Sequence, residues 1–252
     1  MGQKKIFLVS PSPSTFTRRD RDALRQEYRV REIVISNYSG GTGLKRSLLI
    51  TFEILRGVLW ADLTYSWFAH NHSYLAVRLA NLLGKRTLVV IGGYEVAREP
   101  EIGYGALLDP KLAERVNYII ENADHILAVS EFNRREILDL SERRHVAVVY
   151  NGIDCARFTP GKGKEDLVIT VCQISENNIV LKGLDTFLGT ARRLPDLRFA
   201  VVGRALDGSI EDLKWDAPPN VEFALSPSQD ELLHWYRRAK VYCQLSYRES
   251  FG

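Results

Sequence analysis

Short apolar runs rich in β-branched residues alternate with amphipathic segments along nearly the whole chain. The alternation begins with an apolar run at 6–10, a polar turn and a charged, helix-like segment at 18–27. Further strand-like runs follow at 30–36, 63–68, 87–91, 126–129 and 146–149. Strands that alternate with helices in this way predict an α/β fold in which parallel sheets carry helices on both faces.

Turn-forming and charged residues interrupt this alternation after Tyr150. The segments 151–154 and 160–164 are rich in Gly, Asn, Pro and Lys, which do not extend a helix or a central strand. We therefore expect a first domain over 1–160 and a second over 161–252, each doubly wound and Rossmann-like. In the second domain, strands are expected at 168–172, 198–202, 221–223 and 241–245, and helices at 184–193 and 228–238. So few strands indicate an incomplete domain.

The charge balance and the cysteines exclude several classes of protein. The 252 residues include 34 Lys and Arg against 31 Asp and Glu, a balance too even for a nucleic-acid-binding protein. Cys155, Cys172 and Cys243 have no paired spacing and no neighbouring His, so neither a zinc site nor a disulfide framework is indicated. The most apolar stretch, 48–60, is shorter than the roughly 20 residues of a membrane-spanning helix. With no signal peptide recognised, we expect a cytoplasmic protein.

Five short motifs follow one another from the middle of the chain to its last residue. They are Ala123-Asp124 through Ser130-Glu131, Tyr150-Asn151-Gly152-Ile153-Asp154, Lys182-Gly183-Leu184, Val201-Val202-Gly203 and Glu249-Ser250-Phe251-Gly252. In order and spacing the set resembles the retaining glycosyltransferases of family 4, which have the GT-B fold of two Rossmann-like domains. In that family the last motif contains a second glutamate, which would lie beyond Gly252, so the donor motif is expected to be cut.

The resemblance implies a sugar transferase that uses a nucleotide-sugar donor, retains the anomeric configuration and needs neither a metal nor a further cofactor. The acceptor, a glycan, a lipid-linked sugar or a small molecule, stays open. Lys182 and Glu249 are the implied catalytic residues, because Lys182 would stabilise the leaving phosphate and Glu249 would bind the donor sugar. Gly203, Arg204 and the backbone of Ser250, Phe251 and Gly252 complete the implied donor site.

Two positions depart from the family pattern. Gln173 stands where an arginine commonly precedes the donor lysine, and it can bond a phosphate without neutralising it. Arg204, after Gly203, is the expected substitute, and the loop 175–181 before Lys182 is expected to be longer than usual. Gly92 stands where the family often carries a histidine near the transferred sugar, so no catalytic role passes to that position.

The acceptor side offers further candidates at the ends of predicted strands. Gly92 and Gly93 would let the backbone approach a ligand closely, and Glu95 is either an acceptor contact or a turn carboxylate. His70 and His72 follow the run 63–68 at the edge where α/β sheets bind ligands. A pair of exposed or helix-capping histidines is the plainer interpretation, so both stay open.

Three other patterns are weaker. The glycine-rich loop 39–43 matches neither the P-loop nor the dinucleotide fingerprint, and we expect a simple connection. Asp20 and Asp22 spell an Asp-x-Asp metal signature, but two positions on a helix point to opposite sides. Basic residues over 18–31 are interleaved with acids, so a solvated helix face is expected, with a peripheral contact to an anionic lipid or a phosphorylated acceptor as the alternative.

Two other functions compete with sugar transfer. A fragment or pseudoenzyme that binds a sugar nucleotide without transferring it fits Gln173, Gly92 and the cut motif. A nucleotide-cofactor oxidoreductase would share the same alternation of strands and helices, but the loop 11–14 after the first strand has no glycine fingerprint. Titration with NAD and with nucleotide sugars separates these hypotheses.

Overall fold

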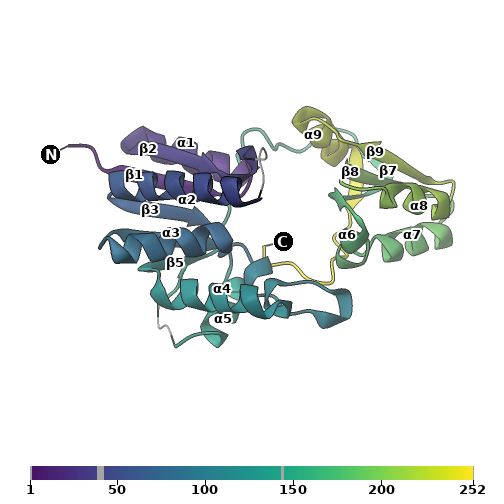
Figure 1. The fold of residues 1–252 in the computed structure, drawn as a ribbon. Coiled ribbons are helices and arrows are strands. Elements are labelled where there is room, and N and C mark those ends of the chain that lie inside the picture. Colours follow the sequence, from purple (N-terminus) through teal and green to yellow (C-terminus); the bar gives the residue numbers. More distant parts are fainter. Residues whose placement is uncertain (1, 39–42, 143–144, 252) are drawn as a thin grey trace. The chain divides into compact units, whose positions relative to one another are not determined.

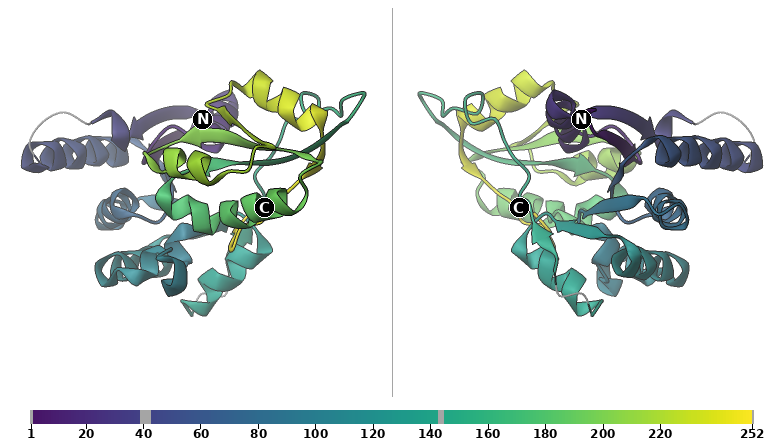
Figure 2. Two further views of the ribbon diagram at one scale, coloured as in Figure 1. Left: turned by 90° about the vertical axis from the view of Figure 1, so that its right-hand side faces the viewer. Right: turned by 90° about the vertical axis from the view of Figure 1, so that its left-hand side faces the viewer.

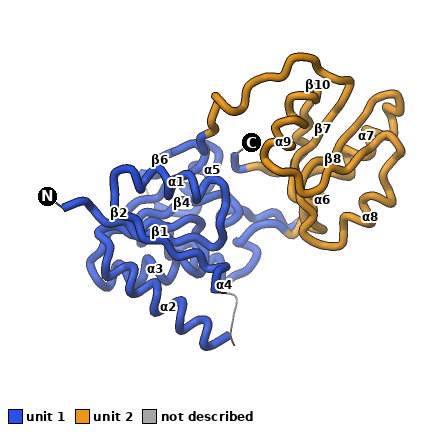
Figure 3. Tube along the Cα trace, turned by 90° about the horizontal axis from the view of Figure 1, so that it is seen from above, with its two compact units in different colours: residues 1–100, 104–152, 250–252 blue, residues 101–103, 153–249 orange. Residues whose placement is uncertain are grey.

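The computed structural model describes residues 2–38, 43–142 and 145–251, and these residues form two compact units. Unit 1 comprises 1–100, 104–152 and 250–252, and unit 2 comprises 101–103 and 153–249 (Figure 3). The division therefore falls between Gly152 and Ile153, whereas the sequence analysis drew it at residue 160. Each unit is described by itself.

A parallel sheet of six strands forms the centre of unit 1 (Figure 1). Its order is β2-β1-β3-β4-β5-β6, and every described pairing is parallel. The strands are β1 Lys5–Ser10, β2 Arg29–Val34, β3 Leu63–Trp67, β4 Arg86–Ile91, β5 His125–Ala128 and β6 Ala147–Val148. All six predicted runs are confirmed as strands, although the run at 30–36 ends early in a 3₁₀ turn at Ile35–Asn37.

Helices cover both faces of this sheet. The helices of unit 1 are α1 Thr15–Glu27, α2 Gly43–Trp60, α3 Asn71–Leu82, α4 Pro110–Asn122 and α5 Glu131–Asp139. Successive side chains of a strand point to opposite faces, so Phe7 and Val9 pack with α2 and α3, while Ile6 and Leu8 pack on the side of α1. Short 3₁₀ turns lie at Tyr94–Val96, Pro100–Ile102 and Ala106–Leu108.

Unit 2 has a parallel sheet of four described strands in the order β10-β7-β8-β9. The strands are β7 Glu165–Ile174, β8 Arg198–Ala205, β9 Val221–Leu225 and β10 Ala239–Tyr242, and the helices are α6 Glu176–Leu181, α7 Leu184–Arg193, α8 Ser209–Asp216 and α9 Gln229–Arg238. Ile174 packs with α7 and α8 on one face, and Leu167 and Ile169 pack with α9 on the other. The expected layered α/β arrangement is confirmed in both units (Figure 2).

The local signals at helix starts account for both a confirmed and a wrong prediction. Ser228 and Glu231 form the capping box that their spacing predicts, with Ser228 Oγ accepting from the Glu231 amide at 3.2 Å. The segment 175–181, expected as a long loop, is instead helix α6, which starts at the N-cap Ser175. Six residues are too few to show a helical period. In the described parts of the chain, no helix has the length and apolar character needed to cross a membrane.

Candidate functional site

Lys182 and Glu249, both predicted to bind the donor, form an ion pair in unit 2. The Lys182 Nζ atom lies 2.6 Å from Glu249 Oε1, and both side chains are about a quarter exposed (23% and 26%). Lys182 ends α6, and Gly183 follows in the left-handed conformation at φ 65°, which glycine adopts without strain. The chain therefore turns at Gly183 directly into α7, which holds Lys182 at the carboxyl ends of the strands.

Two more side chains converge on the same carboxylate oxygen. Gln244 Nε2 and Ser246 Oγ each donate to Glu249 Oε1 at 2.6 Å. The segment that carries them runs on from β10, where the Cys243 amide donates to Ile169 O and the Tyr247 amide donates to Leu181 O, each at 2.8 Å. Gln244 and Ser246 were missed by the sequence analysis, which expected a strand over 241–245. The strand β10 ends earlier, at Tyr242, and the sequence after it does not indicate which side chains will meet a distant lysine.

The backbone around this cluster is closely packed. A Cβ atom on Gly183 would overlap the Leu245 carbonyl, and one on Gly203 would overlap the Cys172 carbonyl on the neighbouring strand. Burial raises the pKa of the Cys172 thiol to about 11, while the Lys182 charge lowers it and the Glu249 charge raises it. Cys172 is thus a neutral residue near the ion pair, and Gly203 lets β7 and β8 approach closely.

Gln173 and Arg204 lie side by side on neighbouring strands. The register pairs Gln173 of β7 with Arg204 of β8, one step beyond the pair Cys172 and Gly203. Paired residues of parallel strands point to the same face, so Arg204 is placed where it supplies a cation next to the position of Gln173. That Arg204 takes part in donor binding stays a prediction.

The residues that follow Glu249 in the predicted donor motif are assigned to the other unit. Ser250 and Phe251 are grouped with unit 1. There Ser130 Oγ donates to the Ser250 carbonyl, and the Phe251 ring lies 6.2 Å from the Tyr150 ring. Gly252 lies outside the described residues. Their role toward a donor phosphate therefore stays a prediction from the family resemblance.

Glu95 of unit 1 is buried and bonded to the backbone. Its Oε1 accepts from the amides of Ala69 at 3.0 Å and Gly92 at 3.1 Å, and its Oε2 accepts from Gly93 at 2.9 Å. Burial raises the pKa of the Glu95 carboxyl, while the amide donors oppose the shift. With 1% of its surface exposed, Glu95 holds the ends of β3 and β4 together, which favours the turn carboxylate over an acceptor contact.

His70 and His72 have different surroundings. His72 is buried in α3, with Nε2 2.8 Å from the Trp67 carbonyl oxygen, and burial lowers its pKa to about 4. His70 is the N-cap of α3 and is partly exposed, and burial together with the Arg115 charge lowers its pKa. Of the two, only His70 presents a surface at the predicted edge. His72 lies one helical turn before the buried Ala76 and therefore on the core-facing side of α3.

The glycines near Glu95 adjoin a strained residue. Phe68, directly after β3, has φ 67°, which is rare for a residue with a side chain. A Cβ atom on Gly92 would overlap the Phe68 ring, and Gly93 has φ 121° and approaches Ser250. Gly92 and Gly93 therefore meet packing needs at this edge, and strain of this kind is common near functional sites.

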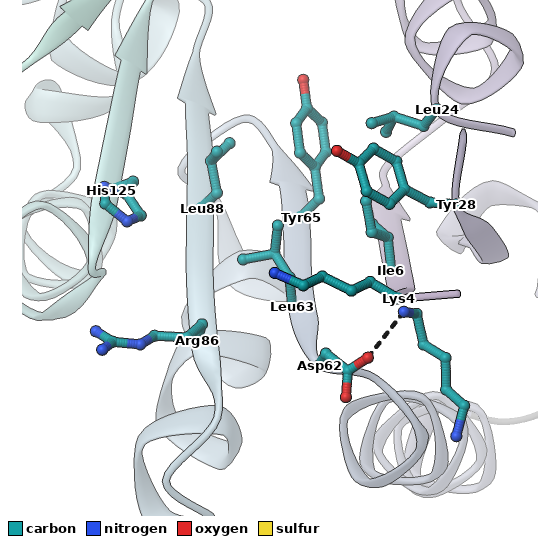
Figure 4. A pocket seen from close by; sticks show the side chains of 11 residues that line it. Lys4, Ile6, Leu24, Tyr28, Asp62, Leu63, Tyr65, Arg86, Leu88 and His125 are labelled. Atoms are coloured by element: carbon teal, nitrogen blue, oxygen red, sulfur yellow. Dashed lines mark hydrogen bonds between the residues drawn. The ribbon is translucent and has the colours of Figure 1, made fainter. Parts of the chain in front are cut away.

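A cavity of about 700 Å³ lies elsewhere in unit 1 (Figure 4). Its lining comes from α1 and from the starts of the strands, including Ile6, Leu63 and Leu88, with Asp62 Oδ2 accepting from the Lys5 amide at 2.9 Å. This is the opposite end of the strands from the edge at which α/β sheets bind ligands. None of the site residues predicted from the sequence lines it.

The remaining sequence patterns have structural roles where they are described. Asp20 Oδ2 accepts from Tyr65 Oη at 2.5 Å and Trp67 Nε1 at 2.9 Å, while Asp22 turns outward and pairs with Arg21. The two carboxylates thus diverge, as the helical geometry predicts. No cluster of three or more potential metal-ligating His, Cys, Asp or Glu is present among the described residues. Of the glycine-rich loop, 39–42 lie outside the described part.

The comparisons with known proteins agree with the expected family. Residues 12–157, more than half of the chain, match the family model described as Glycosyltransferase Family 4. D-inositol 3-phosphate glycosyltransferases from Mycobacterium sp. (strain KMS) and Mycolicibacterium smegmatis are 26% and 24% identical over 231 and 222 residues, covering 78% of this chain in each case. The chain spans about half the length of these relatives, 51%.

Solved structures show the same fold. Sucrose-phosphate synthase from Thermosynechococcus elongatus matches with a TM-score of 0.73 at 16% identity, over 99% of this chain and 77% of that one. An α,α-trehalose-phosphate synthase (UDP-forming) from Burkholderia vietnamiensis matches with a TM-score of 0.64 at 11% identity, over 99% and 80%. This confirms the predicted GT-B fold with two Rossmann-like domains, and at these identities the likeness extends to the fold alone.

Proposed function

Because the chain belongs to glycosyltransferase family 4, we propose that it transfers a sugar from a nucleotide-sugar donor to an acceptor, with retention of configuration and without a metal ion. The observation that carries this proposal is the ion pair of Lys182 and Glu249 in unit 2. A lysine and a carboxylate at the carboxyl ends of parallel strands offer one group for phosphate and one for sugar hydroxyls.

Lys182 and Glu249 satisfy one another through their ion pair. When a donor binds, Lys182 exchanges the carboxylate oxygen for a phosphate oxygen of the nucleotide diphosphate. Glu249 then accepts from hydroxyls of the donor sugar, held in place by Gln244 and Ser246, which donate to its Oε1 at 2.6 Å. The ion pair therefore orders both groups before the donor arrives.

The chemical step needs charge stabilisation more than a protein nucleophile. The bond between the anomeric carbon and the phosphate oxygen breaks, and the acceptor oxygen bonds to the same face of the sugar. The acceptor proton passes to the departing phosphate oxygen, so the charges balance. Lys182 stabilises the negative charge that develops on the phosphate, an effect that is large where water is excluded.

The names of similar proteins guide the choice of first probes. Two solved structures of similar fold are named for a UDP-forming reaction and for bound UDP-2-fluoro glucose, and the curated relatives are named D-inositol 3-phosphate glycosyltransferases. We therefore propose a UDP sugar as the first donor and inositol 3-phosphate as the first acceptor. Carbohydrate and lipid-linked acceptors complete the panel.

A transfer assay tests this function. Nucleotide release is measured with each donor, with and without each acceptor, for the wild type, Lys182→Gln and Lys214→Gln. Lys214 is the matched control, because it lies in the same unit and pairs with Glu211 on the surface of α8. We expect Lys182→Gln to lower the rate by about 10²- to 10³-fold, as loss of one transition-state donor does, with Lys214→Gln unchanged.

Two outcomes of this assay would contradict the proposal. NMR of the product should show the anomeric configuration of the donor, and an inverted product would exclude retention. A donor that binds without turnover, across the whole panel, would assign the chain to the non-catalytic alternative.

A further inference from the structure

The carboxylate of Glu249 is held at one of its two oxygens. Three donors meet at Oε1, namely Lys182 Nζ, Gln244 Nε2 and Ser246 Oγ, each at 2.6 Å. Within the described part of the chain, the second oxygen, Oε2, accepts from no donor. A carboxylate that is fixed at Oε1 in this way can present Oε2 to another molecule.

The amide of Gln244 can hold Glu249 in one orientation and not in the reverse one. An amide group accepts at its oxygen and donates at its nitrogen. A reversed Gln244 would bring its oxygen against the Glu249 carboxylate, and two acceptors repel each other. The Nε2 atom donates to Glu249 Oε1 at 2.6 Å and to Ser246 Oγ at 2.8 Å. The contact that sets the orientation of this amide therefore also determines how firmly Glu249 is held.

Tyr242 sets the orientation of the Gln244 amide. Its hydroxyl donates to Gln244 Oε1, so the oxygen end of the amide is occupied and the nitrogen end faces Glu249. Burial raises the pKa of Tyr242 to about 12, which keeps this hydroxyl protonated and able to donate at neutral pH. Tyr242, Gln244 and Ser246 occupy alternate positions, and alternate residues of an extended chain lie on one side of it. The three side chains thus form a hydrogen-bonded row that ends at Glu249.

The first residue of this row is anchored on the sheet of unit 2. Tyr242 is the last residue of β10 and pairs with Ile169 of β7. Its ring lies 5.7 Å from the ring of Tyr236 in α9, at an angle of 54°. Tyr236 in turn packs against the buried cluster that includes Ile169. Gln244 and Ser246 lie beyond the end of the strand, so Tyr242 connects them to the rigid part of the unit.

We propose that Tyr242 is a positioning residue of the donor site: its hydroxyl orients Gln244, and Gln244 holds Glu249 with Oε2 toward the hydroxyl groups of the donor sugar. This inference rests on the proposed function, because it takes Glu249 as the group that binds the sugar. Tyr242 acts on the sugar through Glu249 and does not act on the phosphates, which Lys182 contacts. A change at Tyr242 should therefore separate the affinity for a nucleotide sugar from the affinity for its nucleoside diphosphate.

Two measurements on the whole chain test this role. Calorimetric titration compares UDP with UDP-glucose, or with the nucleotide sugar that the transfer assay selects and its nucleoside diphosphate. NMR of the free protein follows the side-chain amide signals of Gln244, which Gln244→Leu assigns. Both are carried out on the wild type, on Tyr242→Phe and on Tyr236→Phe. Tyr236 is the matched control, because its ring adjoins that of Tyr242 and its hydroxyl lies outside the row.

We expect Tyr242→Phe to weaken the nucleotide sugar by about 3- to 10-fold, as loss of one neutral hydrogen bond does, and to shift the Gln244 amide signals. Its affinity for the nucleoside diphosphate should stay that of the wild type, and Tyr236→Phe should match the wild type throughout. The double variant Tyr242→Phe/Gln244→Leu should bind the nucleotide sugar as Gln244→Leu does, because the two side chains act in one row.

Three results would overturn the proposal, and they can be told apart. If Tyr242→Phe bound the nucleotide sugar as tightly as the wild type, the positioning role would fail while the sugar-transfer function stood. Equal weakening of the nucleotide sugar and the nucleoside diphosphate would assign Tyr242 a purely structural role. If the wild type bound no nucleotide sugar, the sugar-transfer function would fail and the role of Tyr242 with it, even with a shift of the Gln244 signals in Tyr242→Phe.

Discussion

Acid is expected to destabilise unit 1 through His72. This side chain is 7% exposed in α3, and burial lowers its pKa from 6.5 to about 4. The ring of His70, 6.3 Å away, adds a further lowering when it is charged. Because the folded pKa lies below the unfolded one, the unfolded chain binds the proton more readily. Stability that is present above pH 6.5 is therefore lost as the pH falls toward the folded pKa.

The size of the loss follows from these two pKa values. Between about pH 7.5 and about pH 5, proton linkage at one such histidine removes about 2 kcal/mol from the free energy of unfolding. His72→Gln should abolish this part of the pH dependence, because Gln can still donate to the Trp67 carbonyl and does not titrate. The free energy of unfolding of His72→Gln still depends on pH in part, because other groups titrate as well.

Urea unfolding at both pH values measures the effect. The informative quantity is the difference in pH dependence between the wild type and His72→Gln. His125→Gln is the control, because His125 is exposed at the start of β5, and it should keep the wild-type pH dependence. If His72→Gln lost as much stability in acid as the wild type, His72 would not be a buried neutral group and the reasoning would fail.

Two pairs of substitutions test the packing of each unit by urea unfolding. Gly203→Ala places a Cβ atom against the Cys172 carbonyl and should lower the free energy of unfolding by about 1–3 kcal/mol. Its control, Gly189→Ala, lies in α7 with open space around it and should raise the free energy of unfolding by about 1 kcal/mol. If Gly203→Ala left the stability unchanged, the close contact between the strands would be contradicted. Asp20→Ala removes the acceptor of a tyrosine and a tryptophan and should cost about 2–4 kcal/mol, but Asp22→Ala less than about 0.5 kcal/mol. Equal losses would contradict the divergence of the two carboxylates.

The strands were the most predictable part of the fold. The inner strands β1, β3 and β4 are largely buried between layers of helices, so their apolar, β-branched runs mark them clearly. The helices α5, α6 and α8 were not predicted, because α6 has six residues, α8 has eight and α5 has nine. A helix this short shows too few turns for its period to stand out, and its start depends on a cap such as Ser175.

The candidate site likewise has features that the sequence predicts and features that it does not. The position of Lys182 directly before the turn into α7 was predictable from the glycine that follows it. Its contact with Glu249 joins residues far apart in sequence, and the donors Gln244 and Ser246 carry no local signal. The role of Glu95 depends on the amide of Ala69, brought near by the pairing of β3 with β4. Contacts of this kind are set by the tertiary fold.

Calorimetric titration of the chain with UDP and with a UDP sugar tests the central claim most directly. Lys182→Gln should weaken both ligands by about 10- to 100-fold, because a charge-assisted phosphate contact is lost. Glu249→Gln should weaken the UDP sugar alone and leave UDP as tight as before or tighter, since Lys182 is then free. If Lys182→Gln left both affinities unchanged, or if NAD bound tightly while nucleotide sugars gave no heat, the proposed donor site would be contradicted.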